Sequence, residues 1–303
     1  MVFFDEEVLD RLSARLPGGI RPVSVLGQGG CGVVVCVQSD GFSDQFAMKI
    51  AWKGNEEQIL REQQALQCLR GVNGVVKLLE QGQEPAPYFM CEVVSGQTMD
   101  AYLKRGRVTV ERALRLLARL ADIVGGIHAR GIVHRDLKPE NVIVKWGKTP
   151  SPVVIDFGLA MRYGYGELPD SVTGTLSYMA PEAFDLRHPP GPGQDLYALG
   201  IILYWMCAGT MPFKGENRMQ VCAQHYMEPI PNLPRRYPAR LNDLVHLSLR
   251  KDSRSRLSDA KAFGRVLREA IEELGSLGDQ IIPGADVTRS RGSRIKTLVE
   301  EAQ

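Results

Sequence analysis

The sequence predicts an α+β fold in which a small sheet with one main helix precedes a larger, mainly helical part. Valine-rich segments separated by glycines run from residue 22 to residue 50, and this pattern is typical of three strands. Residues 56–70 return to helical periodicity, with Ile59, Leu66 and Leu69 on one face. After Ser95 and Gly96 the apolar spacing is mainly helical, so strands and helices occupy different parts of the chain.

The remaining elements follow from the same periodicities. Strands are expected over 75–79 and 88–94, which would complete a predominantly antiparallel sheet, and short strands at 142–145 and 153–156. Helices are expected over 98–104, 110–130, 194–208, 216–226, 240–250 and 258–274. The segment 157–180 lacks regular spacing, and irregular segments of this length inside a domain usually carry function.

These elements divide the chain into three regions. Residues 1–19 form an expected N-terminal helical extension, capped by Asp5 and stopped by Pro17 and two glycines. Residues 20–275 form the main domain, with a first part over 20–94 and a second over 95–275. Residues 276–303 are an expected polar C-terminal tail.

Composition excludes several classes of protein. A formal net charge of +2 over 303 residues does not favour a nucleic acid or an anionic membrane as partner. Six cysteines are scattered without CxxC or Cys/His metal spacing, which favours a reduced, cytoplasmic setting. The N-terminus has acids where a secretory signal needs a basic flank, and the apolar stretch 198–209 is too short to span a bilayer. We therefore expect a freestanding protein that is neither exported nor anchored.

Two short motifs indicate the chemistry. HRDLKPEN at 134–141 contains Asp136 and Asn141, and DFG at 156–158 begins with Asp156. Two acids and an amide that converge on one point can hold magnesium and orient a hydroxyl, which phosphoryl transfer from a nucleotide requires.

A glycine-rich segment near the N-terminus fits the same chemistry. Residues 27–34 read GQGGCGVV and match G-x-G-x-x-G-x-V at Gly27, Gly29, Gly32 and Val34. Glycines let a strand–turn–strand backbone pass close to phosphates, although any tight hairpin can be rich in glycine.

Lys49 follows on a predicted strand. It is either an edge lysine that discourages aggregation or a point charge for phosphates that is held by a carboxylate. Glu62 is the best candidate partner because it lies inside the helix, whereas Glu56 and Glu57 at the helix start are explained by the helix dipole. Lys49 and Glu62 are separated by only 13 residues, which leaves room for no more than a short connection between the strand and the helix.

Together these motifs resemble the eukaryotic-type (Hanks) protein kinases. APE at 180–182 follows DFG in the family's order, and Ala47-Met48-Lys49 matches its V-A-I-K strand. The similarity covers about residues 20–275 and extends to bacterial serine/threonine kinases through FKGEN at 213–217. It implies a bilobal protein-kinase-like fold with nucleotide in the cleft, ATP and Mg2+ (or Mn2+) as cofactors, and serine or threonine hydroxyls of proteins as substrates. It also implies self-association for autophosphorylation on the activation segment.

The resemblance assigns roles residue by residue. Asp136 would accept or orient the proton of the attacking hydroxyl, Lys138 would contact the transferred phosphate, and Asn141 and Asp156 would bind the metal ions. Lys49, paired with Glu62, would hold the α and β phosphates. The adenine would lie against Val34, Ala47 and Ile143, with Cys91 guarding the pocket behind it and the main chain of Glu92 and Val94 bonding the base.

Other family positions would support the site. His134 would pack beneath Phe157, Asp195 would brace the catalytic loop, and Glu182 and Arg256 would form a buried ion pair, while Thr175 is typical of the serine/threonine branch. Arg135 would bind a phosphate on Ser171 or Thr173, because guanidinium binds phosphate through paired hydrogen bonds. Cys31 at the tip of the glycine loop departs from the family's usual residue.

Two alternatives are weaker. A nucleotide-binding scaffold without activity would lack catalytic groups, but every one of them is present. A small-molecule phosphotransferase on a related fold would lack both the Lys138 pattern and the APE segment.

Overall fold

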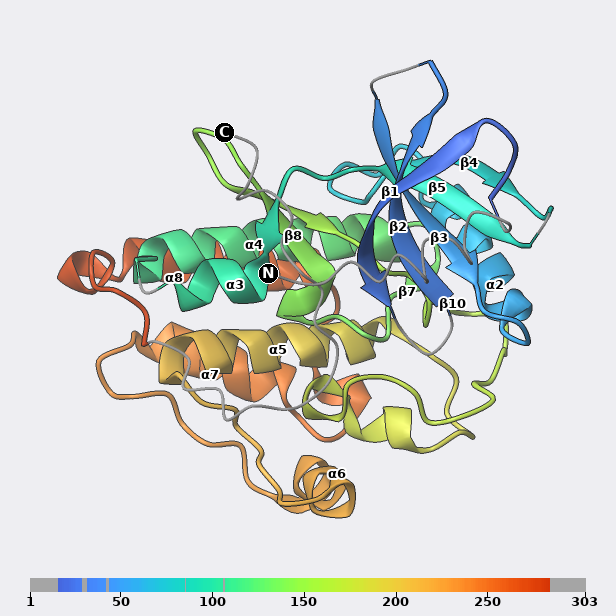
Figure 1. Cartoon of the computed structure of the whole chain (residues 1–303). Helices are drawn as coiled ribbons and strands as arrows, with labels where there is room; N and C mark the ends of the chain where they lie inside the picture. Colours follow the sequence, from blue (N-terminus) through green and yellow to red (C-terminus); the bar gives the residue numbers. More distant parts are fainter. Residues whose placement is uncertain (1–15, 29–31, 42–43, 85, 106, 284–303) are drawn as a thin grey trace. The chain divides into compact units, whose positions relative to one another are not determined.

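The computed structural model describes residues 16–28, 32–41, 44–84, 86–105 and 107–283, and these form two compact units (Figure 1). The first unit comprises the described residues up to Gly71 together with Val76–Gly96, and the second comprises Val72–Val75 and the described residues from Gln97 onward. Along the chain the last segment of the first unit ends at Gly96. Leu16, the described end of the expected N-terminal extension, is buried in the sheet core, and the rest of that extension lies outside the described residues.

The first unit is an antiparallel sheet with one helix. Five strands lie in the order β1-β2-β3-β5-β4. Their bounds are β1 Ile20–Gln28, β2 Gly32–Ser39, β3 Gln45–Ala51, β4 Leu78–Gly82 and β5 Tyr88–Glu92, and α2 spans Glu56–Cys68. Alternating residues Val33, Val35 and Val37 are fully buried together with Met48 and Ile50, as the period of two of a half-buried sheet requires.

One expected strand is displaced along the chain. The apolar run at 75–79 predicts a strand, but β4 begins only at Leu78. Val75 instead forms a parallel bridge with Val154, and Val154 N donates to Gly74 O at 2.8 Å. The prediction was wrong here because an apolar run shows that a segment is buried, not which neighbour its backbone bonds.

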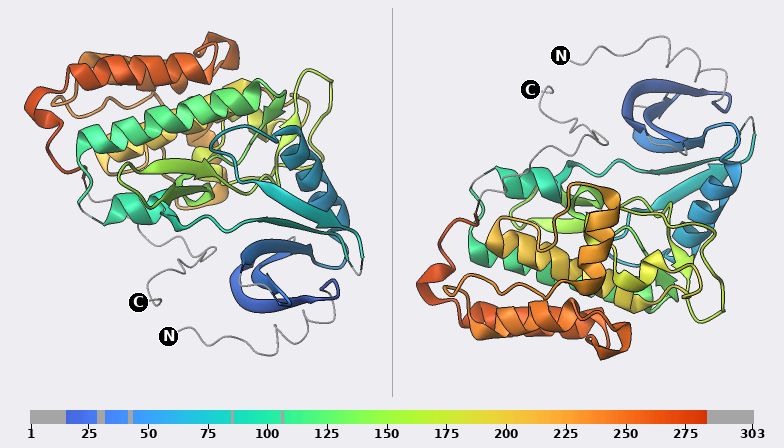
Figure 2. Two further views of the ribbon diagram at one scale, coloured as in Figure 1. Left: turned by 90° about the horizontal axis from the view of Figure 1, so that it is seen from above. Right: turned by 90° about the horizontal axis from the view of Figure 1, so that it is seen from below.

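The second unit is mainly helical. Its helices are α3 Met99–Lys104, α4 Val110–His128, α5 Pro192–Ala208, α6 Arg218–Met227, α7 Ala239–Ser248 and α8 Ala260–Glu272. Short strands are β6 Gly96–Thr98, β7 Ile132–Val133, β8 Val142–Lys145, β9 Ser151–Val154 and β10 Met161–Arg162. Helix α8 lies along α4, and Figure 2 shows the two helices side by side.

Helix α5 forms the centre of this unit. It is apolar all round and buried from Gln194 to Cys207, which is typical of a helix with neighbours on every side. It ends at Gly209, whose φ of 73° is the left-handed conformation that favours glycine at a helix end. None of the helices in the described part of the chain has the length and apolar character needed to cross a membrane.

Packing continues beyond the expected end of the domain at residue 275. Leu277 and Ile282 are buried, and Ile282 N donates to Val108 O at 3.0 Å, just before α4. The described part of the expected polar tail therefore packs on the helical unit through Leu277 and Ile282, and the remainder, with its arginines, lies outside the described residues.

Candidate active site

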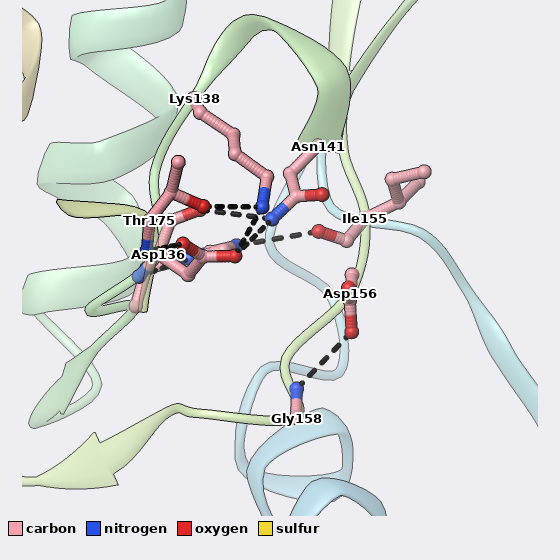
Figure 3. Close-up of polar contacts among 8 residues, drawn as sticks. Asp136, Lys138, Asn141, Ile155, Asp156, Gly158 and Thr175 are labelled. Atoms are coloured by element: carbon pink, nitrogen blue, oxygen red, sulfur yellow. Dashed lines mark hydrogen bonds and ion pairs between the residues drawn. The ribbon is translucent and has the colours of Figure 1, made fainter. Parts of the chain in front are cut away.

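The loop between β7 and β8 brings polar side chains together on one carboxylate (Figure 3). Asp136 Oδ1 accepts a hydrogen bond from the backbone N–H of Thr175 at 2.9 Å. Asp136 Oδ2 accepts from Lys138 Nζ at 2.7 Å and from Asn141 Nδ2 at 3.0 Å. Lys138 Nζ also donates to Thr175 Oγ1 at 2.6 Å, so residues far apart in sequence hold the carboxylate in one orientation.

The backbone of this loop is strained and is held by a buried aspartate. Arg135 has a φ of 66°, a conformation that costs a non-glycine residue about 1–3 kcal/mol. Asp195 on α5, which is 1% exposed, accepts the backbone N–H of His134 and that of Arg135, each at 2.9 Å. These two bonds compensate the strain and fix the direction in which Asp136 leaves the loop.

A residue that the sequence analysis missed completes this support. His128, at the end of α4, lies with Nε2 2.8 Å from Asp195 Oδ2. Burial alone would raise the pKa of Asp195, but the contacts with His128 and His134 outweigh it and lower the pKa, so the carboxylate stays charged. The available signal was a histidine on the otherwise apolar buried face of an amphipathic helix.

The DFG motif lies next to this loop. Phe157 is 1% exposed, and its ring centre lies 4.9 Å from that of His134, as the family resemblance implies. His134 Nε2 lies 3.3 Å from Ile155 O, which ties the loop to the chain just before the motif. Asp156 has a φ of 62°, and its Oδ1 accepts from Gly158 N at 3.4 Å.

The donor set at this point fits a hard divalent cation. Asn141 Nδ2 also donates to Asp136 O at 2.9 Å. The Oδ1 atom of Asn141 therefore lies on the side of the amide where Asp156 lies (Figure 3). An amide oxygen and a carboxylate are ligands that Mg2+ prefers when phosphates and water supply the rest. Across the described part of the chain no group of three or more His, Cys, Asp or Glu side chains is arranged to hold a metal ion.

The sheet unit carries a buried ion pair. Lys49 Nζ on β3 lies 2.6 Å from Glu62 Oε2 on α2, and the side chains are 16% and 2% exposed. The short separation in sequence is explained by the turn in which Asn55 N donates to Trp52 O, after which α2 starts at once. Glu62 therefore reaches Lys49 from the second turn of the helix.

Strand register places the other expected nucleotide-binding residues of this unit. Val34 pairs with Lys49 across β2 and β3, and Ala47 pairs with Cys91 across β3 and β5. Burial, and then the carboxylates of Glu62 and Glu92, raise the pKa of Cys91 to about 12, so its thiol is not a nucleophile at neutral pH.

The glycine-rich segment is described only in part. Gly27 pairs with Val34 across β1 and β2, and a Cβ at Gly32 would lie 2.3 Å from Ile50 O, so only glycine fits there. Gly29 and Cys31 lie outside the described residues. Val94 is half-buried just after β5 in this unit, and Ile143 is half-buried on β8 in the helical unit.

The comparison with known families agrees with this geometry. The sequence matches the protein kinase domain family over residues 20–267. The chain belongs to this family. The expected fold class is confirmed as well, because an antiparallel sheet unit with one helix is followed by a mainly helical unit.

Three bacterial kinases are similar to this protein kinase domain. PknA of Mycobacterium tuberculosis, a serine/threonine-protein kinase, is 32% identical over 185 residues, which are 60% of this chain and 42% of that protein. Pkn1 of Myxococcus xanthus is 30% identical over 283 residues, 88% of this chain and 40% of that protein. A probable serine/threonine-protein kinase of Clostridium perfringens is 33% identical over 251 residues, 78% and 36% of the two chains. This chain thus spans less than half the length of each of these three relatives.

The kinase domain also contains the expected buried ion pair. Arg256 Nη1 and Nη2 donate to Glu182 Oε1 and Oε2 at 2.6 and 2.7 Å, and the Arg256 side chain is 0% exposed. Arg256 also donates to Arg250 O and Gly193 O, each at 2.8 Å. The pair therefore ties the APE segment to α5 and to the loop before α8.

The expected phosphate-binding residues are not joined in this structure. Arg135 Nη1 donates to Leu159 O at 3.4 Å and lies 2.7 Å from Met161 Sδ, and burial lowers the pKa of the guanidinium. Ser171 is exposed and Thr173 half-buried, and within the described segment neither is bonded to Arg135. If Ser171 or Thr173 is phosphorylated, that residue would have to move before its phosphate could bind Arg135.

Proposed function

We propose that this chain is an ATP-dependent serine/threonine protein kinase that transfers the γ-phosphoryl group to serine or threonine hydroxyls of proteins. The observation that carries the proposal is the arrangement in which Lys138 bridges Asp136 and Thr175. A lysine two residues after the base, bonded to a threonine of the activation segment, matches the serine/threonine branch of the family.

The residues of the helical unit would perform the proton transfer and the positioning. Asp136, with its side chain 12% exposed, would accept the proton of the substrate hydroxyl as the oxygen attacks phosphorus and the bond to the leaving diphosphate breaks. Lys138 would lie beside the transferred group and offset negative charge there. Both side chains are already held by Thr175, so little reorganisation would be needed at the moment of reaction.

Cations would supply the remaining stabilisation. Asn141 and Asp156 would hold Mg2+ (or Mn2+), which when bound neutralises charge on the phosphate oxygens. Lys49, oriented by Glu62, would bind the α and β phosphates as a point charge. The adenine would contact Val34, Ala47 and Ile143.

The setting and partners follow from the same proposal. The substrates would be proteins with accessible serine or threonine, including a second copy of this chain that phosphorylates Ser171 or Thr173. Cys36, Cys91, Cys207 and Cys222 are free thiols, which supports a reducing, cytoplasmic compartment.

Phosphoamino-acid analysis after incubation with labelled ATP and magnesium tests the function. The proposal expects phosphoserine or phosphothreonine with the intact chain and none with Asp136→Asn. Absence of label in the intact chain would support a scaffold instead, and label only on added small molecules would support a small-molecule phosphotransferase. Repeating the assay with Mn2+ and after chelation separates the two metals.

Regulation by phosphate is tested separately. Replacing both Ser171 and Thr173 by alanine is expected to lower activity and to remove label from the activation segment. Full activity in this double variant would refute the role of Arg135 in binding a phosphate.

A further inference from the structure

The hairpin that joins β8 to β9 carries an exposed tryptophan between two lysines. Residues 145–150 read KWGKTP. Trp146 is 43% exposed, and Lys145 and Lys148 are exposed as well. An exposed large aromatic residue on a short turn makes no contribution to a core, and the proposed phosphotransfer does not use it.

Two helices bring arginines to this hairpin. The guanidinium of Arg105, which follows α3, lies 5.2 Å from the centre of the Trp146 ring, within the range of a cation–π contact. Arg119 Nη1 on α4 donates to Pro150 O at 2.9 Å. The indole is therefore held on one side by a cation while much of it remains open to solvent.

These residues form one basic surface, here called the Trp146 surface. Its members are Trp146 and the exposed cations that lie on the hairpin or contact it: Arg105, Arg119, Lys145 and Lys148. The carboxylates of the adjoining helices have cationic partners outside this surface: Asp100 pairs with Lys104 at 2.8 Å, Glu111 with Arg115 at 2.7 Å and Asp122 with Arg268 at 2.9 Å. They consequently do not neutralise the surface.

The chemistry of the Trp146 surface favours an acidic peptide over other anionic partners. Lysines next to Trp146 in sequence and an arginine against its ring offer cations to the carboxylates of one extended segment, whose apolar part would cover the indole. A membrane would require several apolar side chains to enter the interface, whereas Trp146 is the one large exposed apolar residue of this hairpin. A nucleic acid would gain little long-range attraction from a chain whose formal net charge is only +2.

We propose that the Trp146 surface docks an extended, glutamate- or aspartate-rich peptide segment of a partner protein, with Trp146 covered and Lys145 and Lys148 paired with carboxylates. Docking does not depend on phosphotransfer. It would add a second point of attachment for a partner, which raises the effective concentration of the rest of that partner near the chain.

Titration of a fluorescein-labelled oligoglutamate peptide, followed by anisotropy, tests the proposal on the full chain. The paired substitution Lys145→Glu with Lys148→Glu is expected to weaken binding at least about tenfold, because like charges then face the peptide. Trp146→Ala is expected to weaken binding roughly fivefold. Added salt should weaken binding by the wild-type chain, since the contacts are exposed.

A matched control makes the same change of charge elsewhere on the helical unit. Lys261→Glu with Arg265→Glu, both exposed on α8, should change the affinity less than about twofold if the effect is local. Circular dichroism of each variant checks folding, which exposed charge changes on a turn and a helix surface should leave intact.

Three results would overturn the proposal: equal weakening by the α8 control, no binding of the peptide at low salt, or tighter binding of anionic vesicles or single-stranded oligonucleotide through the same residues. Phosphorylation of a short neutral peptide should be the same in the hairpin variants and the wild-type chain. If the wild-type chain does not phosphorylate the neutral peptide, the proposed function is contradicted, whereas the result of the peptide-binding experiment is unaffected.

Discussion

His225 is expected to make the folded chain lose stability as the pH falls. Its side chain on α6 is 0% exposed and lies among the rings of Phe184, Tyr197 and Phe213. Nδ1 lies 2.8 Å from the Tyr197 hydroxyl, and Nε2 has no partner among the described residues. A second proton would place positive charge in this apolar cluster, which already faces the ammonium of Lys251, 4.1 Å from the centre of Phe213.

The magnitude follows from proton linkage. Burial, and then the charge of Lys251, lower the pKa of His225 from 6.5 to about 4. Between these two pKa values the unfolded chain holds a proton on His225 that the folded chain lacks, so the free energy of unfolding falls as the pH decreases. Above the unfolded pKa neither state holds this proton, and His225 makes no pH-dependent contribution. The loss amounts to about 2 kcal/mol one pH unit above the folded pKa and about 3 kcal/mol at that pKa.

Urea unfolding across this pH range measures the effect on the helical unit. Trp205 on α5 is 4% exposed and reports this unit alone once Trp52 and Trp146 are replaced by phenylalanine. His225→Phe in that background should remove most of the pH dependence, so the stability difference between the parent and this variant should grow on acidification.

A second variant separates the effect of burying His225 from the effect of its hydrogen bond with Tyr197. Tyr197→Phe removes the hydroxyl and leaves His225 buried, so the pH dependence should persist. If the parent and His225→Phe lose stability in parallel as the pH falls, the histidine is not the titrating group and the reasoning is refuted.

Four further predictions concern the site and its support. Asp136→Asn should lower the rate of phosphotransfer on the order of 10²–10⁴-fold in single-turnover assays while nucleotide binding is retained, and near-normal rates would exclude it as the base. Glu62→Gln should lower kcat/KM for ATP about tenfold or more by releasing its lysine partner, whereas an unchanged value would show that the pair is only structural. Arg256→Met should destabilise the chain by about 3–5 kcal/mol in urea unfolding because it strands Glu182, and the double variant with Glu182→Gln should cost less. Cys91, whose pKa is raised to about 12, should alkylate far more slowly at neutral pH than the exposed thiol at the end of α2, and equal rates by mass spectrometry would contradict its burial.

Local sequence was sufficient to bring together the candidate catalytic groups of the loop after β7. Asp136, Lys138 and Asn141 lie within one short motif, so their closeness along the chain already indicated that their side chains could meet. The pairing of Lys49 with Glu62 was also predictable, because a strand followed at once by a helix confines the possible partners. The short separation that seemed a departure reflects only a tight turn.

Partners far along the chain were harder to predict. No spacing rule indicates that His128 at the end of α4 meets Asp195 on α5, because that contact depends on how two helices cross. Likewise, periodicity predicted a strand over 75–79, yet Val75 bonds to β9 and the strand begins at Leu78.

The sequence by itself determined the type of fold, the family resemblance and the candidate chemical groups, since periodicity and short motifs are properties of neighbouring residues. Only the tertiary structure decided how those groups are held: the strained loop fixed by Asp195, the histidine behind it, and the Trp146 surface assembled from a hairpin and two helices. The physical reason is that hydrogen-bond geometry and charge density depend on distances in space, and residues more than 60 positions apart reach them only after the core has packed.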